Sequence, residues 1–450
     1  MALILAGCAV GPAYQRPTTP DVSRFKEAEG WLPAAPADAL ERGPWWSLFG
    51  DPVLDSLAAR VEVSNQNVAA AVAAYAQARA VVREQRSSLF PTVTLDGGAS
   101  RSGSANVSPG NKYQSSIGGS WEPDVWGRLG RAVGSASASA QASAADLASA
   151  RLSAQGELAI NYLTLRQTDA QKALLASTLA GYQRSLEITQ NRYSAGIAAR
   201  TDVLQAQTQL ASARADDAGL VRQRTQLEHA IAVLVGEAPG NFSLPPADWK
   251  PLVPEFPVGV PSTLLQRRPD IAAAERSVAV ANEQIGIARS AYYPSLSLGA
   301  SYGLGASRAA DLFSAPASVW SLGLSAAQTL FNAGATRARV QGSEAAHAQA
   351  VARYRQTVLT AFQGVEDQLA ATRVLLTQQD LRRQASEAAD QVEQQVLNRY
   401  RSGQVGYTEV ITAQATALSA RRALVQIMAD RQTTAVALIQ SLGGGWQAGQ

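Results

Sequence analysis

The chain of 450 residues contains an internal duplication. Residues 192–214 and 399–421 align without a gap and share ten identities over 23 positions, at a constant offset of 207 residues. The shared residues include an Arg-Tyr pair, a glycine three positions after the tyrosine, and a closing Ser-Ala-Arg. Such agreement at one fixed offset favours tandem duplication, so we expect the two halves to repeat one arrangement of helices and strands.

Long helical tracts flank both copies of the duplicated segment. The first tract runs from about Gly130 to about Ser194 and is interrupted by Gly196. About 65 helical residues span roughly 100 Å, far more than a helix of a globular domain, which indicates a coiled-coil-like assembly. The other tracts that we expect are about 202–235, 335–400 and 409–442.

Each half also contains two segments in which apolar and polar residues alternate with a period of two. In the first half, for example, Val93 and Leu95 alternate with Thr and Asp residues. This period predicts strands, which form hairpins at about 92–126 and about 295–329. A stretch rich in Gly, Ser and Asn predicts a loop over 102–112 inside the first hairpin.

Each predicted hairpin has one apolar face with aromatic residues and one face of Ser, Thr, Gly and Gln. Strands of about ten residues with this pattern are typical of a membrane β-barrel, and the alternative is an amphipathic sheet that covers a soluble core. Four strands cannot close a barrel, because the smallest membrane barrels use about eight and exposed sheet edges are not tolerated in lipid. We therefore expect an obligate oligomer in which two or three chains share the barrel.

The N-terminus contains the sequence Leu5-Ala6-Gly7-Cys8, which has the form of a bacterial lipoprotein cleavage box. Cys8 would then become the acylated first residue of the mature protein, and its lipid would anchor the chain to a membrane. Because the residues before the box are too few for a signal peptide, we expect the natural start to lie upstream. Ala9 after the cysteine, rather than Asp, predicts sorting to the outer membrane of a Gram-negative cell.

Composition excludes several classes of protein. The net charge of +3 and the dispersed arginines give no case for nucleic-acid binding. The only cysteine is Cys8, and His229 and His347 lie far apart, so no metal-ligand spacing and no cofactor site is predicted. No catalytic triad or phosphate loop is visible, which argues against an enzyme. No apolar run reaches 18 residues, so no membrane-spanning helix is predicted.

These patterns predict a duplicated helix and hairpin organisation. A helical tract starts at Asp51-Pro52 and continues to about Leu89 before the first hairpin. In chain order we expect a truncated signal segment and lipobox (1–8), an extended N-terminal arm (9–53), a first repeat (54–235, with long helices at about 130–235), a Pro-rich linker (236–261), a second repeat (262–442, with long helices at about 335–442) and a tail (443–450).

Several motifs resemble the outer-membrane factors (TolC/OprM-like) of tripartite efflux systems, most closely the NodT-type lipoproteins that serve resistance-nodulation-division pumps. The resemblance covers essentially the whole mature chain. Its motifs, besides the lipobox, are Trp45-Trp46 before Phe49 and Asp51-Pro52, Arg267-Arg268-Pro269-Asp270-Ile271, the two Arg-Tyr-x-x-Gly segments and the closing Leu442-Gly443-Gly444-Gly445-Trp446.

The resemblance implies a mixed α and β membrane protein that forms a homotrimer. Three copies would build a 12-stranded β-barrel in the outer membrane and a 12-helix α-barrel in the periplasm, with the N-terminal arm, the linker and the C-terminus in an equatorial region. It also implies a periplasmic adaptor (membrane fusion protein) and an inner-membrane resistance-nodulation-division pump as partners, with small toxic compounds as cargo.

The two Arg-Tyr-x-x-Gly segments would form helix tips at the periplasmic end, where a gate is expected. Gly196 and Gly403 suit the left-handed position after a helix, and Thr201 and Thr408 suit N-caps. The alternative is that these segments are ordinary hairpin turns. The predicted tip-turn residues are Arg192, Tyr193, Gly196, Arg399, Tyr400 and Gly403, and the predicted constriction residues are Asp202, Gln205, Thr408, Glu409 and Thr412.

The second tip departs from the family pattern. Relatives often carry Leu-Thr-Leu-Leu-Asp-Ala-Gln there, with a Leu and the Asp forming constriction rings, whereas this chain has Thr408 and Thr412 at those two positions. These threonines are four apart and lie on one helix face. An acidic ring would then come from Asp202 or Glu409, or be absent, and the two tips of each chain would differ.

Two other classes of protein share parts of this pattern. A trimeric coiled-coil adhesin also has long helices and a shared barrel, but its barrel segment is terminal rather than inserted in both halves. The outer-membrane exit duct of a type I protein secretion system would keep the fold and change the cargo. The lipobox and the closing Gly-Gly-Gly-Trp favour small-molecule efflux over secretion.

Overall fold

A computed structural model of the chain describes residues 10–19, 25–27, 44–105, 107–254, 268–313 and 318–444. The chain divides into two compact units, each of which takes segments from both predicted repeats. Unit 1 comprises Met1–Thr19, Ala73–Asp146 and Asp270–Thr357, and unit 2 comprises Pro20–Val72, Leu147–Pro269 and Val358–Gln450. Cys8, Ala9, Arg267, residues 255–261 of the linker and Gly445-Trp446 lie outside the described residues.

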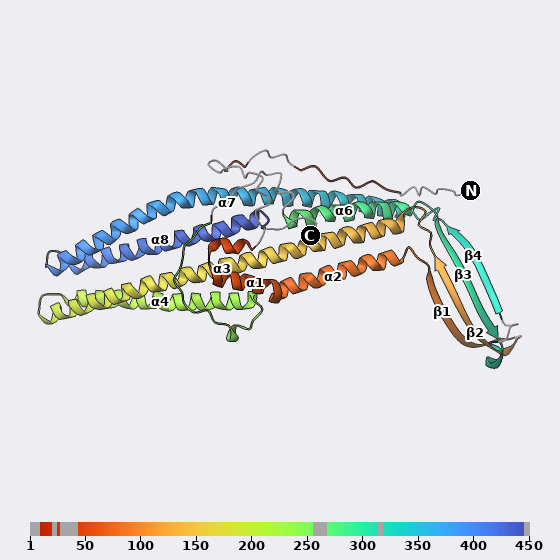
Figure 1. Ribbon diagram of the computed structural model, residues 1–450, viewed down its shortest axis with the longest axis horizontal. Coiled ribbons are helices and arrows are strands. Elements are labelled where there is room, and N and C mark those ends of the chain that lie inside the picture. Colours follow the sequence, from red (N-terminus) through yellow and green to blue (C-terminus); the bar gives the residue numbers. More distant parts are fainter. Residues whose placement is uncertain are drawn as a thin grey trace. The chain divides into compact units, whose positions relative to one another are not determined.

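The helices confirm the predicted long tracts, and their bounds match in the two halves (Figure 1). The two longest helices have 67 residues each and are followed by helices of 35 residues. The helices are α1 (Pro52–Ser64), α2 (Gln66–Ser87), α3 (Arg128–Ser194), α4 (Arg200–Leu234), α6 (Pro269–Ser290), α7 (Ala335–Arg401) and α8 (Tyr407–Ser441), with short 3-10 turns η1 (Trp45–Phe49), η2 (Pro239–Asn241) and η3 (Ala309–Asp311).

The four predicted strands form one antiparallel sheet in unit 1. Its order is β1-β2-β3-β4, so the two hairpins of the two halves lie side by side and pair through β2 and β3. Within the described residues, one edge of β1 and one edge of β4 have no strand partner. The strands are β1 (Thr92–Ser104), β2 (Val107–Trp121), β3 (Ser295–Ala306) and β4 (Ser318–Ala327).

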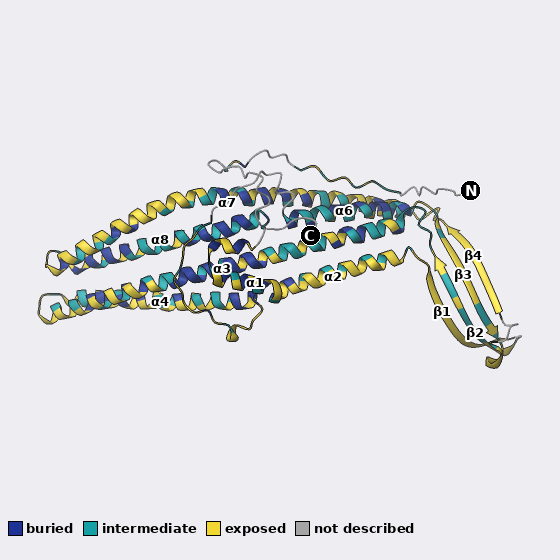
Figure 2. Cartoon of the chain, viewed as in Figure 1, coloured by how far each residue is buried: buried dark blue, intermediate teal, exposed yellow. Residues whose placement is uncertain are grey.

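The sheet has one apolar and one polar face, as the alternation predicts. One row of paired residues crosses all four strands on the apolar face, and it consists of Leu95, Ile117, Tyr302 and Trp320. The next row is polar, and it includes the Ser301 and Ser321 hydroxyl oxygens, 2.8 Å apart. Leu95 and Trp320 remain 78% and 75% exposed, and β1 and β4 are exposed along their whole length (Figure 2). Within the part of the chain that the structure describes, the apolar face is therefore uncovered.

The predicted loop over 102–112 is wrong. β1 continues to Ser104 and β2 begins at Val107, so Ser102 pairs with Gly110 and Arg101 with Asn111. The segment has the composition of a loop because its small polar residues do not alternate with apolar ones. Antiparallel pairing nevertheless satisfies the hydrogen-bonding groups of their backbone, as in any other strand.

The helical tract predicted over about 52–89 is two helices. Asp51 caps α1 as expected, since its carboxylate accepts the backbone N–H groups of Val53 and Leu54. Asn65 then ends α1 with extended backbone angles and starts α2, because its Oδ1 accepts the N–H group of Val68 at 3.1 Å. Its Nδ2 donates to the Leu234 carbonyl at 2.8 Å, which ties the break to the end of α4.

The described part of the predicted extended arm includes a short helical turn. Residues Trp45–Phe49 form η1, and Trp45, Trp46 and Phe49 are buried in the main apolar cluster of unit 2 with α1. The helical turn lets all three aromatic rings pack into this cluster and so buries their apolar surface. This tertiary packing decides the structure here, rather than the extended conformation that the local sequence predicts.

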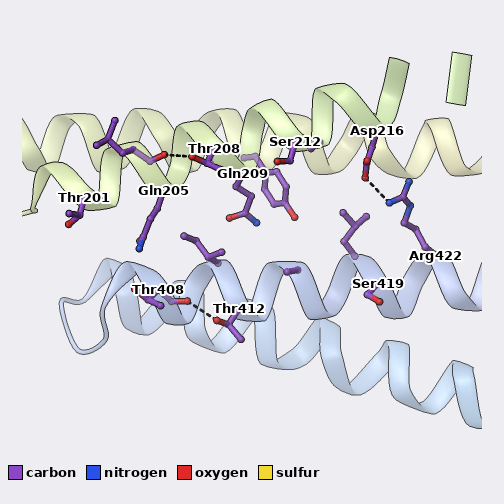
Figure 3. Close-up of a pocket in the computed structure, with 16 residues that line it drawn as sticks. Thr201, Gln205, Thr208, Gln209, Ser212, Asp216, Thr408, Thr412, Ser419 and Arg422 are labelled. Atoms are coloured by element: carbon purple, nitrogen blue, oxygen red, sulfur yellow. Dashed lines mark hydrogen bonds and ion pairs between the residues drawn. The ribbon is translucent and has the colours of Figure 1, made fainter. Parts of the chain in front are cut away.

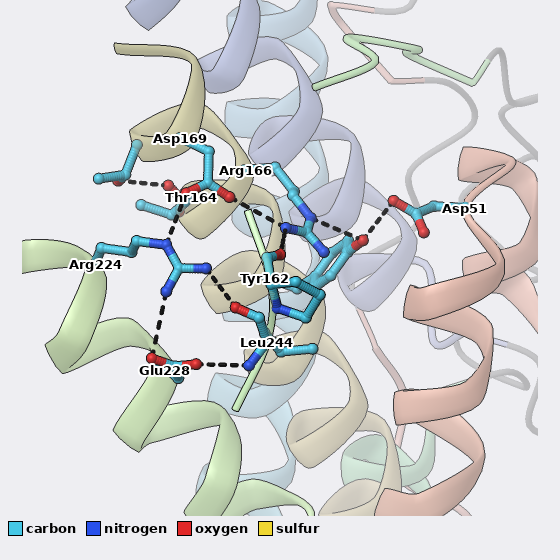
Figure 4. A network of polar contacts seen from close by, with 10 residues as sticks. Asp51, Tyr162, Thr164, Arg166, Asp169, Arg224, Glu228 and Leu244 are labelled. Carbon is cyan, nitrogen blue, oxygen red and sulfur yellow. Dashed lines mark hydrogen bonds and ion pairs between the residues drawn. The ribbon is translucent and has the colours of Figure 1, made fainter. Parts of the chain in front are cut away.

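A buried polar network crosses the core of unit 2 (Figure 4). The Tyr162 hydroxyl donates to Asp51 Oδ2 at 2.6 Å and accepts from Arg166 Nε at 3.1 Å. Arg166 Nη1 donates to Asp169 Oδ2 at 3.1 Å and to the Pro245 carbonyl at 2.9 Å. Burial, followed by the hydrogen bond to Asp51, raises the pKa of Tyr162, so this hydroxyl stays a donor.

Arg224 extends the network from α3 to α4 and to the linker. Its Nε donates to Asp169 Oδ1 at 2.7 Å, and its Nη1 donates to Glu228 Oε2 at 3.3 Å. Glu228 Oε1 accepts the Leu244 N–H group at 2.6 Å, while the Leu244 carbonyl accepts from Arg224. Asp169 therefore serves two arginines at once, with only 5% of its side chain exposed.

Candidate site at the helix tips

The two Arg-Tyr-x-x-Gly segments end α3 and α7 with the same backbone geometry. Gly196 and Gly403 have φ angles of 75° and 73°, which confirms the predicted left-handed position. The residue after each glycine donates its N–H group five positions back, to the carbonyl of Arg192 at 2.8 Å or of Arg399 at 2.9 Å. These are Schellman ends, in which glycine avoids the steric cost that a Cβ atom meets at positive φ.

The predicted N-caps are wrong. α4 begins at Arg200 after Ala199, and α8 begins at Tyr407 after Gly406, with no side-chain cap at either residue. Thr201 and Thr408 are the second residues of their helices, because the turns after the Schellman ends are short and bring the chain into the helix early. Asp202 and Glu409 do lie in the first turns, where a carboxylate interacts favourably with the helix dipole.

We expect Gly403→Ala to destabilise the turn between α7 and α8 by about 1–2 kcal/mol, because alanine is strained at this φ angle. No atom would touch the added methyl group, so the effect would come from the backbone alone. Gly406→Ala is the control for the added methyl group, since Gly406 has a φ of −77° and equally open surroundings; it should cost less than Gly403→Ala, only the loss of glycine at the N-cap of α8. Hydrogen exchange of the tip amides measures the difference, and equal exchange in both variants would contradict it.

The first hairpin (α3 and α4) contacts the second (α7 and α8) through the duplicated residues. The Arg192 guanidinium lies 4.8 Å from the centre of the Tyr400 ring, and its Nη1 donates to the Tyr400 carbonyl at 3.0 Å. The Thr189 and Tyr400 hydroxyl oxygens lie 3.4 Å apart. Arg192 thus combines a cation–π contact with a hydrogen bond to a carbonyl in the last turn of α7.

Tyr407 completes this contact and was missed in the sequence. Its ring centre lies 5.4 Å from that of Tyr400, and both tyrosines are buried in the apolar cluster that joins the two hairpins. Burial raises the pKa of Tyr407 to about 12, so its hydroxyl is protonated throughout the neutral range. The available signal was an aromatic residue where the first copy has Arg200, at the same offset of 207 residues.

A groove of about 820 Å³ lies between α4 and α8 (Figure 3). It brings together three of the predicted constriction residues, Gln205 from α4 and Thr408 and Thr412 from α8. Thr412 Oγ1 donates to the Thr408 carbonyl at 2.9 Å, so the two threonines share one helix face as predicted. Asp202 does not line this groove, and Glu409 lines a separate pocket between α7 and α8.

An ion pair that the sequence did not reveal bridges the same groove. Arg422 Nη1 of α8 lies 2.8 Å from Asp216 Oδ2 of α4, and both residues line the groove. Positions 216 and 422 are not equivalent in the duplication, so self-comparison could not pair them. The pair is partly exposed, and we therefore regard it as a weak link between the hairpins.

The described part of the chain holds no group of three His, Cys, Asp or Glu residues able to bind a metal ion. In the same part, no helix has both the length and the apolar character that crossing a membrane requires. The α4–α8 groove is lined by Thr, Gln and Ser side chains, by apolar residues of both helices, and by the Asp216–Arg422 ion pair.

Comparison with known proteins identifies the family. The model of the outer membrane efflux protein family matches residues 57–237 and 260–444. The chain belongs to this family. It is 32% identical over its whole length to the antibiotic efflux pump outer membrane protein ArpC of Pseudomonas putida, covering 95% of that protein. It is also 32% identical to the pyoverdine export outer membrane protein OpmQ of Pseudomonas aeruginosa, over 99% of this chain and 96% of that protein.

The fold of this outer membrane efflux protein agrees with solved structures. The outer-membrane channel OprN superposes with a TM-score of 0.89 and 30% identity, over 98% of this chain and all of that one. The protein is therefore an efflux channel component of the Gram-negative outer membrane rather than an enzyme. The same relatives favour efflux over the alternative of protein secretion.

Proposed function

We propose that this efflux protein works as a homotrimer. Among the described residues, the four strands have two unpaired edges and an uncovered apolar face, and these features carry the proposal. In lipid, each open edge needs a strand partner, and a second copy of the chain offers the complementary edge. Three copies of four strands give a 12-stranded barrel, with the apolar face toward lipid and the Ser, Thr and Gly face toward the lumen.

The same arrangement would place the helix tips in a ring at the periplasmic end of the channel. We propose that a gate lies there, built from Gln205, Thr408 and Thr412 beside the α4–α8 groove. Asp202 and Glu409 supply carboxylates in the first turns of α4 and α8, and Glu409 lines the pocket between α7 and α8 that also includes Thr408 and Thr412. Opening would then require the hairpins to move apart.

We further propose that Cys8 carries a lipid anchor in the outer membrane. Its position after Leu-Ala-Gly supports this. A periplasmic adaptor and an inner-membrane resistance-nodulation-division pump would complete the system, because an outer-membrane channel has no energy source of its own. The groove is lined mostly by neutral polar and small apolar side chains, which supports broad transport of small toxic compounds, either drugs or metal ions.

Deletion of the gene tests the proposed cargo. We expect the deletion strain to become more susceptible to a panel of antibiotics, dyes, solvents or metal salts, and plasmid-borne wild-type protein to restore resistance. Secreted protein should stay unchanged. Loss of a secreted protein with unaltered susceptibility would contradict the proposal, and native mass measurement of the purified protein tests the trimer separately.

A further inference from the structure

The contact between the two hairpins uses only half of the duplicated Arg-Tyr residues. Under the offset of 207 residues, Arg192 corresponds to Arg399 and Tyr193 corresponds to Tyr400. Within the chain, Arg192 of the first copy binds Tyr400 of the second. The structure therefore contains one Arg–Tyr contact that runs from the first copy to the second.

The other two members lack such a contact in the chain. Tyr193 is 47% exposed, whereas Tyr400 is only 4% exposed. Arg399 is exposed as well. Within the described ranges, neither side chain makes a hydrogen bond, an ion pair or a ring contact. An exposed tyrosine and an unpaired arginine thus occupy the positions equivalent to a buried and bonded pair.

The two hairpins hold these residues in equivalent geometry. Both tips are Schellman ends with the same hydrogen bonds. Farther along, Arg214 donates to Gln183 at 3.2 Å, and the equivalent Arg421 donates to the equivalent Asp390 at 2.7 Å. The hydrogen bonds within the first helical hairpin thus occur again in the second. For this reason, each tip holds its Arg and its Tyr in the same geometry.

We propose that Arg399 of one protomer binds Tyr193 of the next protomer, as Arg192 binds Tyr400 within the chain. This inference rests on the proposed homotrimer, in which first and second hairpins alternate around a ring. The guanidinium of Arg399 stacks on the Tyr193 ring and donates to the Tyr193 carbonyl in the last turn of α3, where the helix dipole favours a cation. Six Arg–Tyr contacts then close the ring, three within chains and three between them.

The proposed Arg399–Tyr193 contacts between chains have fewer neighbouring side chains to stabilise them than the Arg192–Tyr400 contacts within chains. Tyr400 also packs on Tyr407 and lies beside the Thr189 hydroxyl. At the equivalent positions around Tyr193, Arg200 replaces Tyr407 and Val396 replaces Thr189. The ring therefore alternates between strong and weak contacts, and it separates first at the seams between protomers.

Cysteine cross-linking tests the contact. The double variant Arg399→Cys with Tyr193→Cys, purified as the full chain in nanodiscs, is treated with a short bis-maleimide and run on a denaturing gel. We expect bands at two and three times the mass of the chain. Each single variant is the matched control and accounts for Cys8, and it should stay at the mass of one chain. A native trimer that gives no cross-linked band overturns the contact, whereas a native monomer overturns the proposed trimer.

A second pair of variants tests the chemistry of the contact. Tyr193→Phe keeps the aromatic ring, and Tyr193→Leu removes it. We expect the leucine variant to leak, with susceptibility to a large glycopeptide antibiotic raised about fourfold, as loss of an exposed cation–π contact allows. The phenylalanine variant should match the wild type. Equal susceptibility of the two variants overturns the proposal, and immunoblotting of outer-membrane fractions confirms equal amounts of protein.

Discussion

Replacing Asp169 with alanine is expected to lower the free energy of unfolding by about 3–5 kcal/mol, the cost of breaking a buried ion pair from one side. Asp169 accepts from Arg166 Nη1 at 3.1 Å and from Arg224 Nε at 2.7 Å, and the three side chains are 5%, 4% and 13% exposed. The variant leaves two buried guanidinium groups without their shared carboxylate. Because those arginines also hold the Pro245 and Leu244 carbonyls, the linker should loosen together with α3 and α4.

Thermal unfolding of the detergent-solubilised protein measures this loss, and limited proteolysis reports the linker. The matched control is Asp390→Ala, which removes a carboxylate that pairs with Arg421 but whose side chain is 44% exposed. Since Arg421 keeps Glu393 as a partner, we expect this control to cost less than about 1 kcal/mol. Similar losses in both variants would show that the network around Asp169 does not stabilise unit 2.

Regular periodicity made most of the fold predictable from the sequence. The period of two located all four strands, and the long tracts without proline located the helices of 67 residues. Two of the failures arise because pairing with another segment of the chain decides the local structure. Asn65 breaks a helical pattern because the Leu234 carbonyl binds its side chain, and residues 102–112 extend as strands because they pair with one another.

The candidate site was predictable where the duplication marked it. The offset identified Gly196 and Gly403 as turns and drew attention to both Arg-Tyr pairs. It could not reveal that Arg192 binds Tyr400, because neither repeat contains that contact within itself. The same limit hid the Asp216–Arg422 pair, which joins helices from different repeats at positions that are not equivalent.

Introducing a cysteine at Thr412 and oxidising it is expected to abolish efflux reversibly. Thr412 is exposed on α8, lines the α4–α8 groove and lies one turn from Thr408 on the same face. If the three copies of α8 converge at the proposed gate, a disulfide between two protomers would hold their helices together. Accumulation of a fluorescent efflux substrate should rise to the level of the deletion strain, and a reductant should restore efflux.

A control variant distinguishes a disulfide at the proposed gate from a disulfide elsewhere at the helix tip. Ser402→Cys places a thiol in the exposed turn after α7, outside the groove, and should not alter efflux under the same oxidant. A non-reducing gel establishes how much of the Thr412→Cys protein is linked. With one introduced cysteine per chain, at most two of the three protomers can be linked, and unchanged efflux at that maximum would remove Thr412 from the constriction. In that case, holding two protomers together at Thr412 would not limit the passage of substrate. The gate would then lie elsewhere along α8, or on residues that move independently of α8.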